Sequence, residues 1–386
     1  MNRKICIISG TRAEWYLLKN LCKHIKEDKD LKLQLIITAS HLSKDFGLTY
    51  KDIEKDFKID KKIDVLLNSN DEIGICKSMG LLQISLCEAL DELKPDIVVI
   101  LGDRYEMLAV ASVCLIMKIP LAHICGGELT LGAIDDSIRH SITKMSHLHF
   151  TSTQIYANRV FQLGEEKQRI FNVGSLGGEN IKNIKLLNKQ ELSKQLNIKF
   201  NKNIYLITYH PQTLNLKSTK KDINTLVNFL DKLENSTLIF TKANADENGL
   251  MINEIIKKYC DKNHNKAKLF DNLGSKKYLS LMKISNAVIG NSSSGICESP
   301  FFKTPCINIG DRQKGRIFAK NIINCDINNL ENAFKYLNFS DFKKDLRNFK
   351  NPFYSKNTSF NIKEILKKQN LDNILNENFT DFHEYK

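Results

Sequence analysis

The chain has 386 residues and a formal net charge of +13, and 42% of its residues are hydrophobic. The hydrophobic content is typical of a globular protein, and the length predicts two domains because one core rarely spans so many residues. Its lysines are scattered among asparagines and form no basic stripe with interleaved aromatics, so the charge predicts a solvated surface and not a nucleic-acid partner. No apolar run approaches the length of a membrane span, and ten cysteines without a Cys-x-x-Cys pair are typical of reduced thiols in the cytoplasm, not of disulfides or a zinc site.

The first half of the chain alternates short apolar runs with amphipathic segments. The run at 5–8 is too short for a signal peptide and predicts a strand. Further strands are expected at 33–37, 97–101, 121–124, 147–150 and 171–173, with helical patterns such as 16–25 and 79–93 between them. This alternation is typical of a parallel sheet with helices on both faces. A glycine-rich turn at 174–178 ends the series, so we expect an N-terminal catalytic domain over residues 1–178.

A second series of the same kind follows. Its strands are expected at 204–207, 237–240, 267–270, 287–289, 306–309 and 322–323. The series predicts a nucleotide-binding domain over residues 179–356. Apolar residues at helical spacing predict a final helix, and we expect this last segment, 357–386, to pack back on the N-terminal domain. The predicted fold class is α/β, with two Rossmann-like domains that face each other across a cleft.

The most informative motif follows the predicted strand 287–289. Small residues there would present backbone N–H groups and hydroxyls to a phosphate at the start of a helix. The candidates are Ser292, Ser293, Ser294 and Gly295, with Glu298 close behind. An ordinary turn with a helix cap has the same composition, and the Gly-Lys-Ser/Thr ending of a P-loop is missing. The next predicted strand leads to Arg312, so two strand ends together predict a site for a sugar-nucleotide diphosphate.

Three more positions could contact the same diphosphate. Arg12 lies where the first strand gives way to a helix, and only Gly10 precedes it, so the glycine fingerprint of a dinucleotide site is absent. The Arg12 guanidinium would supply the clamp instead, although a surface arginine beside a helix cap fits the pattern equally well. His210 closes the first strand of the second domain, and Asn244 follows its second strand on the same rim.

Four carboxylates fall at the ends of adjacent elements of the first domain: Asp103, Glu128, Asp135 and Asp136. Asp103 follows a central strand, where the active-site groups of α/β folds gather. Helix capping and the helix dipole explain Asp103, Asp135 and Asp136 in purely structural terms. Carboxylates that share a site can nevertheless differ in protonation, so one acts as an acid and another as a base near neutral pH.

Taken together and in this order, the motifs resemble the hydrolysing UDP-N-acetylglucosamine 2-epimerases of bacterial sialic acid pathways. The motifs that carry the resemblance lie at residues 10–14, 102–106, 126–128, 135–144, 210–211, 290–295 and 310–316. The resemblance spans roughly residues 3–316 and is specific. It implies a glycosyltransferase-B-like fold that converts UDP-N-acetylglucosamine and water to N-acetylmannosamine and UDP, without a metal or a nicotinamide cofactor.

The resemblance also assigns roles to single residues. Asp103 and Asp135 match catalytic carboxylates of the family, and Asp136 lies beside the second. The positions that match nucleotide-binding residues are Arg12, His210, Ser292, Ser293, Glu298 and Arg312. Many relatives read His-Ile-Glu-Gly-Gly-Glu where this chain has Cys125, and the first Glu of that motif takes part in proton transfer. Glu128 is the nearest carboxylate in the sequence, so we assign this task to it.

The implied reaction is an elimination followed by a hydration. A base removes the C2 proton while the C1–O bond to the nucleotide breaks, and Arg12 and Arg312 neutralise the departing diphosphate. Water then adds to the unsaturated sugar, and C2 is protonated from the opposite face. Two acid–base groups on opposite faces of the sugar are therefore needed, and Asp103 and the Asp135/Asp136 pair could supply them.

Other readings share parts of this pattern. Enzymes of legionaminic acid synthesis carry out the same reaction on GDP- or UDP-linked 2,4-diacetamido-2,4,6-trideoxyglucose, and a non-hydrolysing epimerase would release UDP-N-acetylmannosamine. A glycosyltransferase of the same fold and a non-enzymatic sugar-nucleotide sensor are further alternatives. For partners, we expect a nucleotide-sugar substrate and a homo-oligomer, a dimer or tetramer, and neither nucleic acid nor membrane; the expected location is the cytoplasm.

Overall fold

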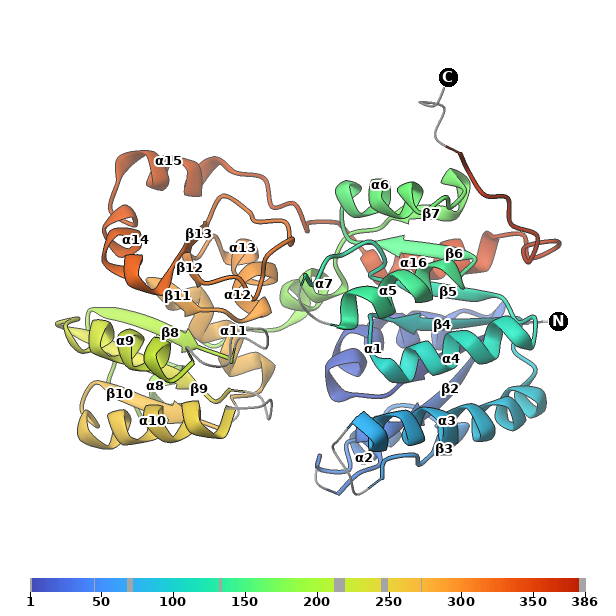
Figure 1. Ribbon diagram of the computed structural model, residues 1–386, viewed down its shortest axis with the longest axis horizontal. Helices are drawn as coiled ribbons and strands as arrows, with labels where there is room; N and C mark the ends of the chain where they lie inside the picture. The colour runs from blue at the N-terminus through green and yellow to red at the C-terminus, as the bar shows by residue number, and fades with distance from the viewer. Residues whose placement is uncertain are drawn as a thin grey trace. The chain divides into compact units, whose positions relative to one another are not determined.

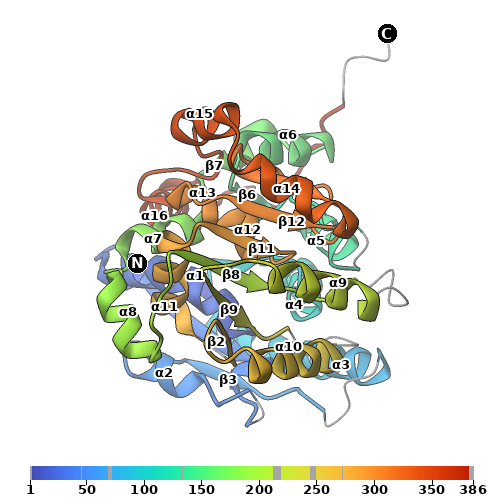
Figure 2. The ribbon, with the colours of Figure 1, turned by 90° about the vertical axis from the view of Figure 1, so that its left-hand side faces the viewer.

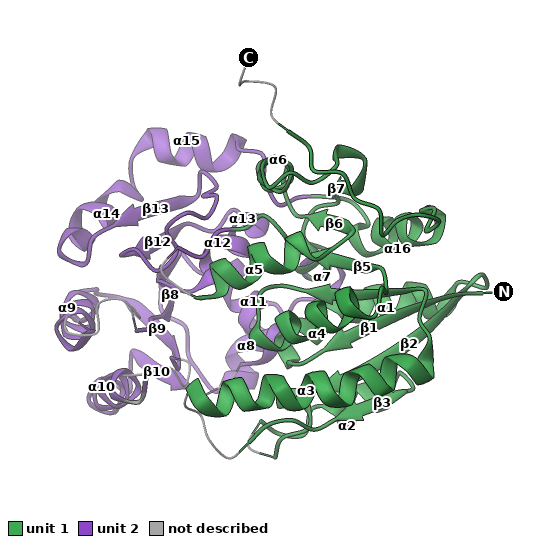
Figure 3. Ribbon diagram, turned by 45° about the vertical axis from the view of Figure 1, so that its right-hand side comes forward, with its two compact units in different colours: residues 1–128, 134–180, 355–386 green, residues 129–133, 181–354 purple. Residues whose placement is uncertain are grey.

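The computed structural model describes residues 2–44, 46–67, 72–131, 134–211, 219–243, 249–271 and 273–381. The chain divides into two compact units (Figure 3). Unit 1 comprises Met1–Glu128, Ile134–Asn180 and Ser355–Lys386, and unit 2 comprises Leu129–Ala133 and Ile181–Tyr354. The sequence analysis placed the domain boundary after residue 178, and in the structure the chain passes from unit 1 to unit 2 after Asn180. The final segment, Ser355–Lys386, belongs to unit 1.

Unit 1 is built on a parallel sheet with the strand order β3-β2-β1-β4-β5-β6-β7 (Figure 1). Its strands are β1 (Arg3–Ser9), β2 (Leu31–Thr38), β3 (Lys61–Ile63), β4 (Ile97–Leu101), β5 (Leu121–Ile124), β6 (Leu148–Thr151) and β7 (Ile170–Asn172). The three-residue strand β3 was not predicted, because Ile63 is its only apolar residue and no run marks it. The strand forms because it pairs with the longer strand β2, and not because its own residues favour a strand strongly.

Helices cover both faces of this sheet because its central strands are apolar on both sides. Ile5 and Ile7 belong to one core cluster, whereas Cys6 and Ile8 belong to the other. The helices of unit 1 are α1 (Arg12–Glu27), α2 (Tyr50–Glu54), α3 (Glu72–Leu93), α4 (Tyr105–Ile116), α5 (Ile134–Lys144), α6 (Gln154–Gln162), α7 (Leu176–Asn183, which crosses the division) and α16 (Thr358–Lys368). The core on the α1 face also takes in α16, and α3, α4 and α5 contribute to the opposite core.

The last helix, α16, is fixed to the first elements of the chain. Ile362 and Leu366 are fully buried in the core that also contains Leu18 of α1. Arg3 donates to the Leu366 carbonyl oxygen at 2.5 Å, and Lys363 lies 3.0 Å from Asp28. Residues more than 300 positions apart therefore complete one core.

Unit 2 repeats the architecture with the strand order β10-β9-β8-β11-β12-β13. Its strands are β8 (Asn203–Thr208), β9 (Ser236–Thr241), β10 (Ala267–Phe270), β11 (Ala287–Gly290), β12 (Cys306–Ile309) and β13 (Ile322–Cys325). Its helices are α8 (Lys189–Leu196), α9 (Thr219–Asp231), α10 (Gly249–Lys262), α11 (Gly274–Ile284), α12 (Ser293–Cys297), α13 (Ser299–Phe302), α14 (Leu330–Tyr336) and α15 (Ser340–Asn348). Helices α9 and α10 pack on one face and α8 and α11 on the other (Figure 2). The prediction of an α/β fold with two Rossmann-like units is confirmed.

One helix qualifies the expectation that no apolar run reaches the length of a membrane span. Over the described residues, α3 alone is long and apolar enough by length and composition, with a mean hydropathy of 1.3 over its best window. One side of α3 nevertheless belongs to the core of unit 1, where Leu82 and Leu86 are fully buried. Buried core helices pass the same test, so the result is weak support for a span.

Replacing Gly290 with alanine should destabilise unit 2. The new Cβ would lie 1.9 Å from the Thr208 carbonyl oxygen, and Gly290 has a φ of +138°. We expect the free energy of unfolding to fall by roughly 2–4 kcal/mol, measured by urea denaturation followed by circular dichroism. Gly177→Ala is the matched control, because its Cβ would meet Leu17 and Ser175 at an ordinary 3.5 Å. Equal midpoints for the two variants would contradict this reading of the Gly290 backbone.

Candidate active site

The predicted carboxylates of unit 1 gather at the carboxyl edge of its sheet. Strands β4, β5 and β6 are neighbours in that sheet, and Asp103 and Glu128 follow the first two of them. Asp135 and Asp136 lie in the first turn of α5, the helix that leads into β6. All four residues are partly exposed, so each can meet solvent or a ligand.

Arg139 links two of these positions. Its side chain is only 4% exposed; it forms an ion pair with the Asp103 carboxylate and donates to the Glu128 carbonyl oxygen at 2.9 Å. A planar guanidinium can hold two acceptors in fixed directions, which a lysine cannot. Arg139 therefore fixes Asp103 relative to the loop after β5. No sequence motif indicates this role directly, since an arginine in an amphipathic helix ordinarily faces solvent.

The loop after β5 presents Glu128 and Cys125 at the same edge. Ser152, directly after β6, donates its hydroxyl to a carboxylate oxygen of Glu128 at 3.2 Å. Cys125 has a φ of +70°, a conformation uncommon for residues other than glycine, and its N–H donates to the Phe150 carbonyl oxygen at 2.9 Å. Strained backbone of this kind concentrates at functional sites, and Cys125 is the position at which the resemblance described above leads us to expect a Glu.

A buried histidine connects the Asp103 loop to α5. His123 Nε2 lies 2.7 Å from the Gly102 carbonyl oxygen, and Nδ1 lies 3.1 Å from the Thr143 hydroxyl. Burial lowers the pKa of His123 to about 4, so the ring is neutral at pH 7. A neutral ring with Nε2–H donating to Gly102 holds the loop in place without adding charge beside Asp103.

The first turn of α5 places Asp136 beside His140. The carboxylate oxygen and the ring nitrogen Nε2 are 3.6 Å apart. Burial lowers the pKa of His140, and the neighbouring Asp136 carboxylate opposes this shift only in part. His140 is therefore neutral at pH 7. Asp135 precedes it in the same turn and is half-buried.

The start of α1 differs from the phosphate-binding arrangement expected around Arg12. The N–H groups of Gly10 and Thr11 donate to the Glu14 carboxylate, at 2.7 and 3.3 Å, so the chain already satisfies these donors. Burial raises the pKa of Glu14 to about 7, against the effect of these hydrogen bonds. Arg12 is exposed. A phosphate at this strand end would therefore be held by the Arg12 side chain and not by a backbone cradle.

In unit 2, Asn291 organises three of the strand ends. Its side chain accepts from the His210 N–H at 2.7 Å and donates to the His210 carbonyl oxygen at 2.9 Å. The Asn291 carbonyl oxygen accepts from Arg312 at 3.3 Å and from the Gln313 amide at 2.9 Å. Since β8, β11 and β12 are adjacent, Asn291 brings His210 and Arg312 to the serine loop. The sequence analysis assigned no role to Asn291, although its position directly after a buried strand is a usable signal.

Arg312 also affects the protonation of His210. Burial lowers the pKa of His210 to about 4, and the positive charge of Arg312 acts in the same direction. The ring is therefore neutral at pH 7, and it can donate one hydrogen bond and accept another.

The serine loop forms a chain of hydroxyls. The hydroxyl oxygens of Ser292 and Ser294 are 3.0 Å apart, and Ser294 lies 2.5 Å from the Tyr278 hydroxyl. Ser293 is exposed, and Gly295 is required because a Cβ there would lie 2.9 Å from the Cys306 sulfur. Helix α12 has only five residues, so its dipole is small. The groups that this loop could present to an anion are therefore its hydroxyls and backbone N–H groups.

Glu298 adds a titratable group behind this loop. Burial of its carboxyl raises the pKa to about 7, and no neighbouring charge offsets the effect. Near neutral pH the carboxyl can therefore donate as well as accept a hydrogen bond. Asn244, the remaining predicted contact, lies outside the described residues. Among the residues that the structure does describe, no group of three or more His, Cys, Asp or Glu is arranged to hold a metal ion.

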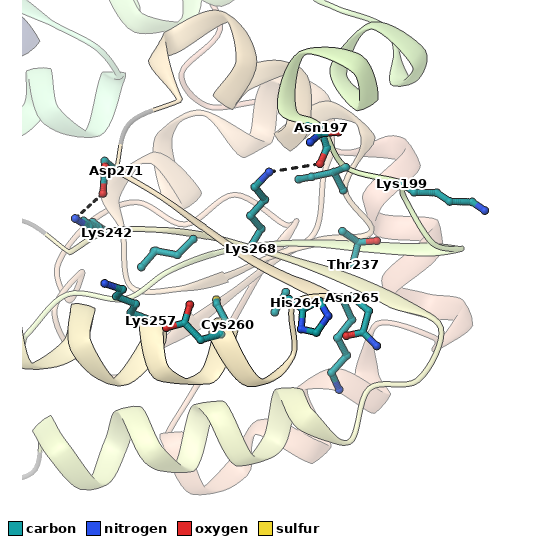
Figure 4. A pocket seen from close by; sticks show the side chains of 15 residues that line it. Asn197, Lys199, Thr237, Lys242, Lys257, Cys260, His264, Asn265, Lys268 and Asp271 are labelled. Carbon is teal, nitrogen blue, oxygen red and sulfur yellow. Dashed lines mark hydrogen bonds and ion pairs between the residues drawn. The ribbon is translucent and has the colours of Figure 1, made fainter.

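A basic groove of about 730 Å³ lies at the β10 edge of unit 2, and none of the predicted site residues lines it (Figure 4). Two of its lysines are committed to the chain itself: Lys242 pairs with Asp271 at 2.5 Å, and Lys268 donates to the Leu196 carbonyl oxygen at 2.8 Å. Lysines along an edge strand commonly prevent unwanted strand pairing. We therefore place the candidate residues of each unit at the carboxyl edge of that unit's own sheet, and not in this groove.

Comparison with known proteins gives consistent results. The family described as UDP-N-acetylglucosamine 2-epimerase matches residues 23–367. The chain is 66% identical over 380 residues to the "GDP/UDP-N,N'-diacetylbacillosamine 2-epimerase (hydrolyzing)" of Campylobacter jejuni, covering 98% of this chain and 99% of that protein. It is 37% identical to the "Polysialic acid biosynthesis protein P7" of Escherichia coli, with 96% of each chain covered. In fold it is similar to the crystal structure of the Neisseria meningitidis UDP-GlcNAc 2-epimerase bound to UDP-GlcNAc, with a TM-score of 0.81, 18% identity, and coverage of 95% and 100%.

Arg139→Lys should reduce turnover, because lysine keeps the charge but cannot hold Asp103 and the Glu128 carbonyl together. A displaced catalytic carboxylate should lower kcat by roughly 10- to 100-fold with little change in KM. Arg159→Lys is the control, since Arg159 donates to the Gly127 carbonyl oxygen at 2.5 Å in the same region. Steady-state kinetics that show equal kcat values for both variants would remove Arg139 from the site.

Glu298→Gln should change how stability depends on pH. The folded-state pKa of about 7 lies above the ordinary value of 4.5, so the folded protein binds the proton more tightly and loses stability as pH rises between these values. Glutamine removes that loss. We expect the variant to equal the wild type near pH 5 and to exceed it by roughly 2–4 kcal/mol at pH 8, measured by denaturant unfolding at both pH values. Glu234→Gln, at an exposed glutamate, serves as the control. If the two variants have the same stability at pH 8, the assignment is refuted.

Proposed function

Because this chain belongs to the hydrolysing UDP-N-acetylglucosamine 2-epimerase family, we propose that it converts a nucleotide-linked 2,4-diacetamido-2,4,6-trideoxyglucose and water to the free 2-epimer and GDP or UDP. The observation that carries this proposal is the 66% identity, over nearly the whole of both chains, to a hydrolysing N,N'-diacetylbacillosamine 2-epimerase. N,N'-diacetylbacillosamine is a 2,4-diacetamido-2,4,6-trideoxyglucose. This diacetamido sugar, which the sequence analysis gave as the alternative substrate, is therefore our first candidate.

UDP-N-acetylglucosamine, which the sequence analysis put first, becomes the second candidate. The 37% identity to a polysialic acid biosynthesis protein and the description of the family favour it. Both substrates share the diphosphate, C1 and a C2 acetamido group, and they differ at C4 and C6. The motifs of this chain serve the shared part, so they are compatible with either sugar. The predicted cytoplasmic location stays a prediction.

The reacting carbon atoms need a base on one face and an acid on the other. We assign the base to Asp103, whose carboxylate is held against the Arg139 guanidinium. In the elimination, Asp103 takes the C2 proton, the C2 electron pair forms the C1–C2 double bond, and the C1–O electron pair leaves with the diphosphate. We assign the acid to the group formed by Asp135, Asp136 and Glu128, which protonates C2 from the opposite face. Water adds to C1 and returns its other proton to this group, and Asp103 releases the proton taken from C2 to the solvent.

The departing diphosphate carries negative charge that the site must stabilise. We assign this task to Arg12 and Arg312 and to the N–H groups and hydroxyls of the serine loop. Hydrogen bonds from these donors to a charged phosphate oxygen are charge-assisted, and such bonds are stronger than neutral ones. Glu298 and His210 complete the predicted nucleotide contacts, and Gly295 allows the close approach of the loop. Asn244 keeps its predicted role on the rim.

The function is tested with three substrates: UDP- and GDP-linked 2,4-diacetamido-2,4,6-trideoxyglucose, and UDP-N-acetylglucosamine. Each is incubated in heavy water or in ¹⁸O-labelled water, and the products are identified by NMR and mass spectrometry. We expect the highest kcat/KM with a diacetamido substrate, one deuterium at C2 of the free sugar, and ¹⁸O in the sugar and not in the nucleotide. Asp103→Asn should keep nucleotide affinity and lose roughly 100-fold or more in turnover.

The other outcomes separate the rival readings. Preferential turnover of UDP-N-acetylglucosamine would move the substrate to the second candidate. A nucleotide-linked epimer as the final product would indicate the non-hydrolysing reaction. Retention of the original C2 hydrogen in the free sugar would sink the elimination mechanism.

A further inference from the structure

Helix α11 of unit 2 carries a tyrosine, Tyr278, to which the proposed reaction assigns no task. Its ring packs against the core cluster that contains Leu281 and Val288, so the core fixes the position of its hydroxyl. That hydroxyl lies 2.5 Å from the Ser294 hydroxyl of the serine loop, and it also forms a hydrogen bond with the Thr208 side chain. Since Thr208 ends β8, Tyr278 joins the end of one strand to the loop that follows another, β11.

The Tyr278 hydroxyl is the middle member of a chain of five hydroxyls. On one side of it, the Thr208 hydroxyl oxygen lies 2.5 Å from that of Thr241, which ends the neighbouring strand β9. On the other side, the Ser294 hydroxyl oxygen lies 3.0 Å from that of Ser292. Side-chain hydroxyls therefore connect the carboxyl ends of β8 and β9 to Ser292, the residue that caps α12.

The number of protons in this chain leaves one O–H group without an acceptor inside it. Each hydroxyl has one proton to donate, and the five hydroxyls are joined by four hydrogen bonds. If all of them donate in the same direction, the remaining proton belongs to an end of the chain, Ser292 or Thr241. Within the described part of unit 2, Ser294 is the only hydrogen-bond partner of the half-buried Ser292 hydroxyl. When the hydroxyls donate toward Ser292, its O–H is therefore available to a ligand.

Tyr278 can transmit this direction because it keeps its proton. Burial raises the pKa of the Tyr278 phenol well above its usual range, and the nearby Glu298 carboxylate acts in the same direction. At any pH at which the protein is folded and active, the phenol therefore has one O–H to donate and lone pairs with which to accept. Hydrogen-bonded hydroxyls also polarise one another, so the O–H at the end of such a chain is a stronger donor than that of an isolated serine.

We propose that Tyr278 is a positioning residue of the diphosphate site and that, through Ser294, it directs the O–H of Ser292 toward a phosphate oxygen. The inference rests on the proposed function, which assigns the serine loop to the diphosphate. An anion beside Ser292 favours donation toward that end of the chain, because only this direction presents a proton to the negative charge. The charge on the diphosphate grows as the C1–O bond breaks, so the same donor stabilises the departing group. Tyr278 itself need not touch the nucleotide.

A double-mutant cycle between Tyr278 and Ser292 tests this inference. Calorimetric titration of the full chain gives the dissociation constants of UDP and GDP, and the nucleotide that the wild type binds more tightly is used for all variants. Tyr278→Phe keeps the packed ring and removes the hydroxyl, whereas Ser292→Ala removes the terminal donor. Each should raise the dissociation constant about 10-fold, the effect of losing a hydrogen bond to a charged group. The double variant should bind about as weakly as either single variant, because both changes remove the same hydrogen bond.

Tyr259→Phe is the matched control, because it removes another phenolic hydroxyl of unit 2, one that hydrogen-bonds to Asp231 at 3.2 Å. It should leave the dissociation constant unchanged. A Tyr278→Phe variant that binds like the control would overturn the inference. A double variant whose loss of affinity equals the product of the two single losses would overturn it as well, since independent structural roles give that result. A wild type that binds neither UDP nor GDP would instead contradict the proposed function, and the inference would fall with it.

Discussion

The contact of Arg139 with the Asp103 carboxylate and the Glu128 carbonyl oxygen is the interaction on which the proposed chemistry depends. Parallel strands bring loops to one edge of a sheet, but loops alone leave their carboxylates free to move. A buried guanidinium that holds two loops fixes the direction of the base toward the sugar. Asn291 performs the corresponding task in unit 2, where one amide side chain and its own carbonyl hold His210, Arg312 and Gln313. In each unit a residue that need not touch the substrate orders those proposed to do so.

Much of the fold could be predicted from the sequence because apolar runs and glycine turns report directly on parallel strands. The run at 287–289 became β11, and the run at 97–101 became β4. Strand β3 could not be predicted, since its three residues depend on pairing with β2 and carry almost no signal of their own. The serine loop follows β11, where the sequence analysis expected it, and the helix that it opens, α12, has only five residues.

The candidate site was less accessible to sequence reasoning, and the reason is physical. Asp103, Glu128 and His210 could be named because polar residues at strand ends stand out against apolar neighbours. Arg139 could not be named, because its role depends on which face of α5 packs against the sheet. In the sequence alone, a buried arginine and an exposed arginine of an amphipathic helix look the same. The substrate was ambiguous for a related reason: the diphosphate, C1 and C2 are common to both sugars, so residues that serve them are shared by enzymes of either specificity.

The position of α16 has a consequence for how the chain is made. This helix contains residues 358–368 and completes a core that it shares with α1. Unit 1, most of which is synthesised before unit 2, therefore completes its core only after unit 2 has been synthesised. Unit 2, whose chain ends at Tyr354, has all its strands available before α16 is synthesised. During synthesis, the core that α1 shares with α16 therefore stays incomplete while unit 2 is translated. Apolar surface that is exposed during synthesis makes a partly made chain prone to aggregation, and docking of α16 removes this exposure.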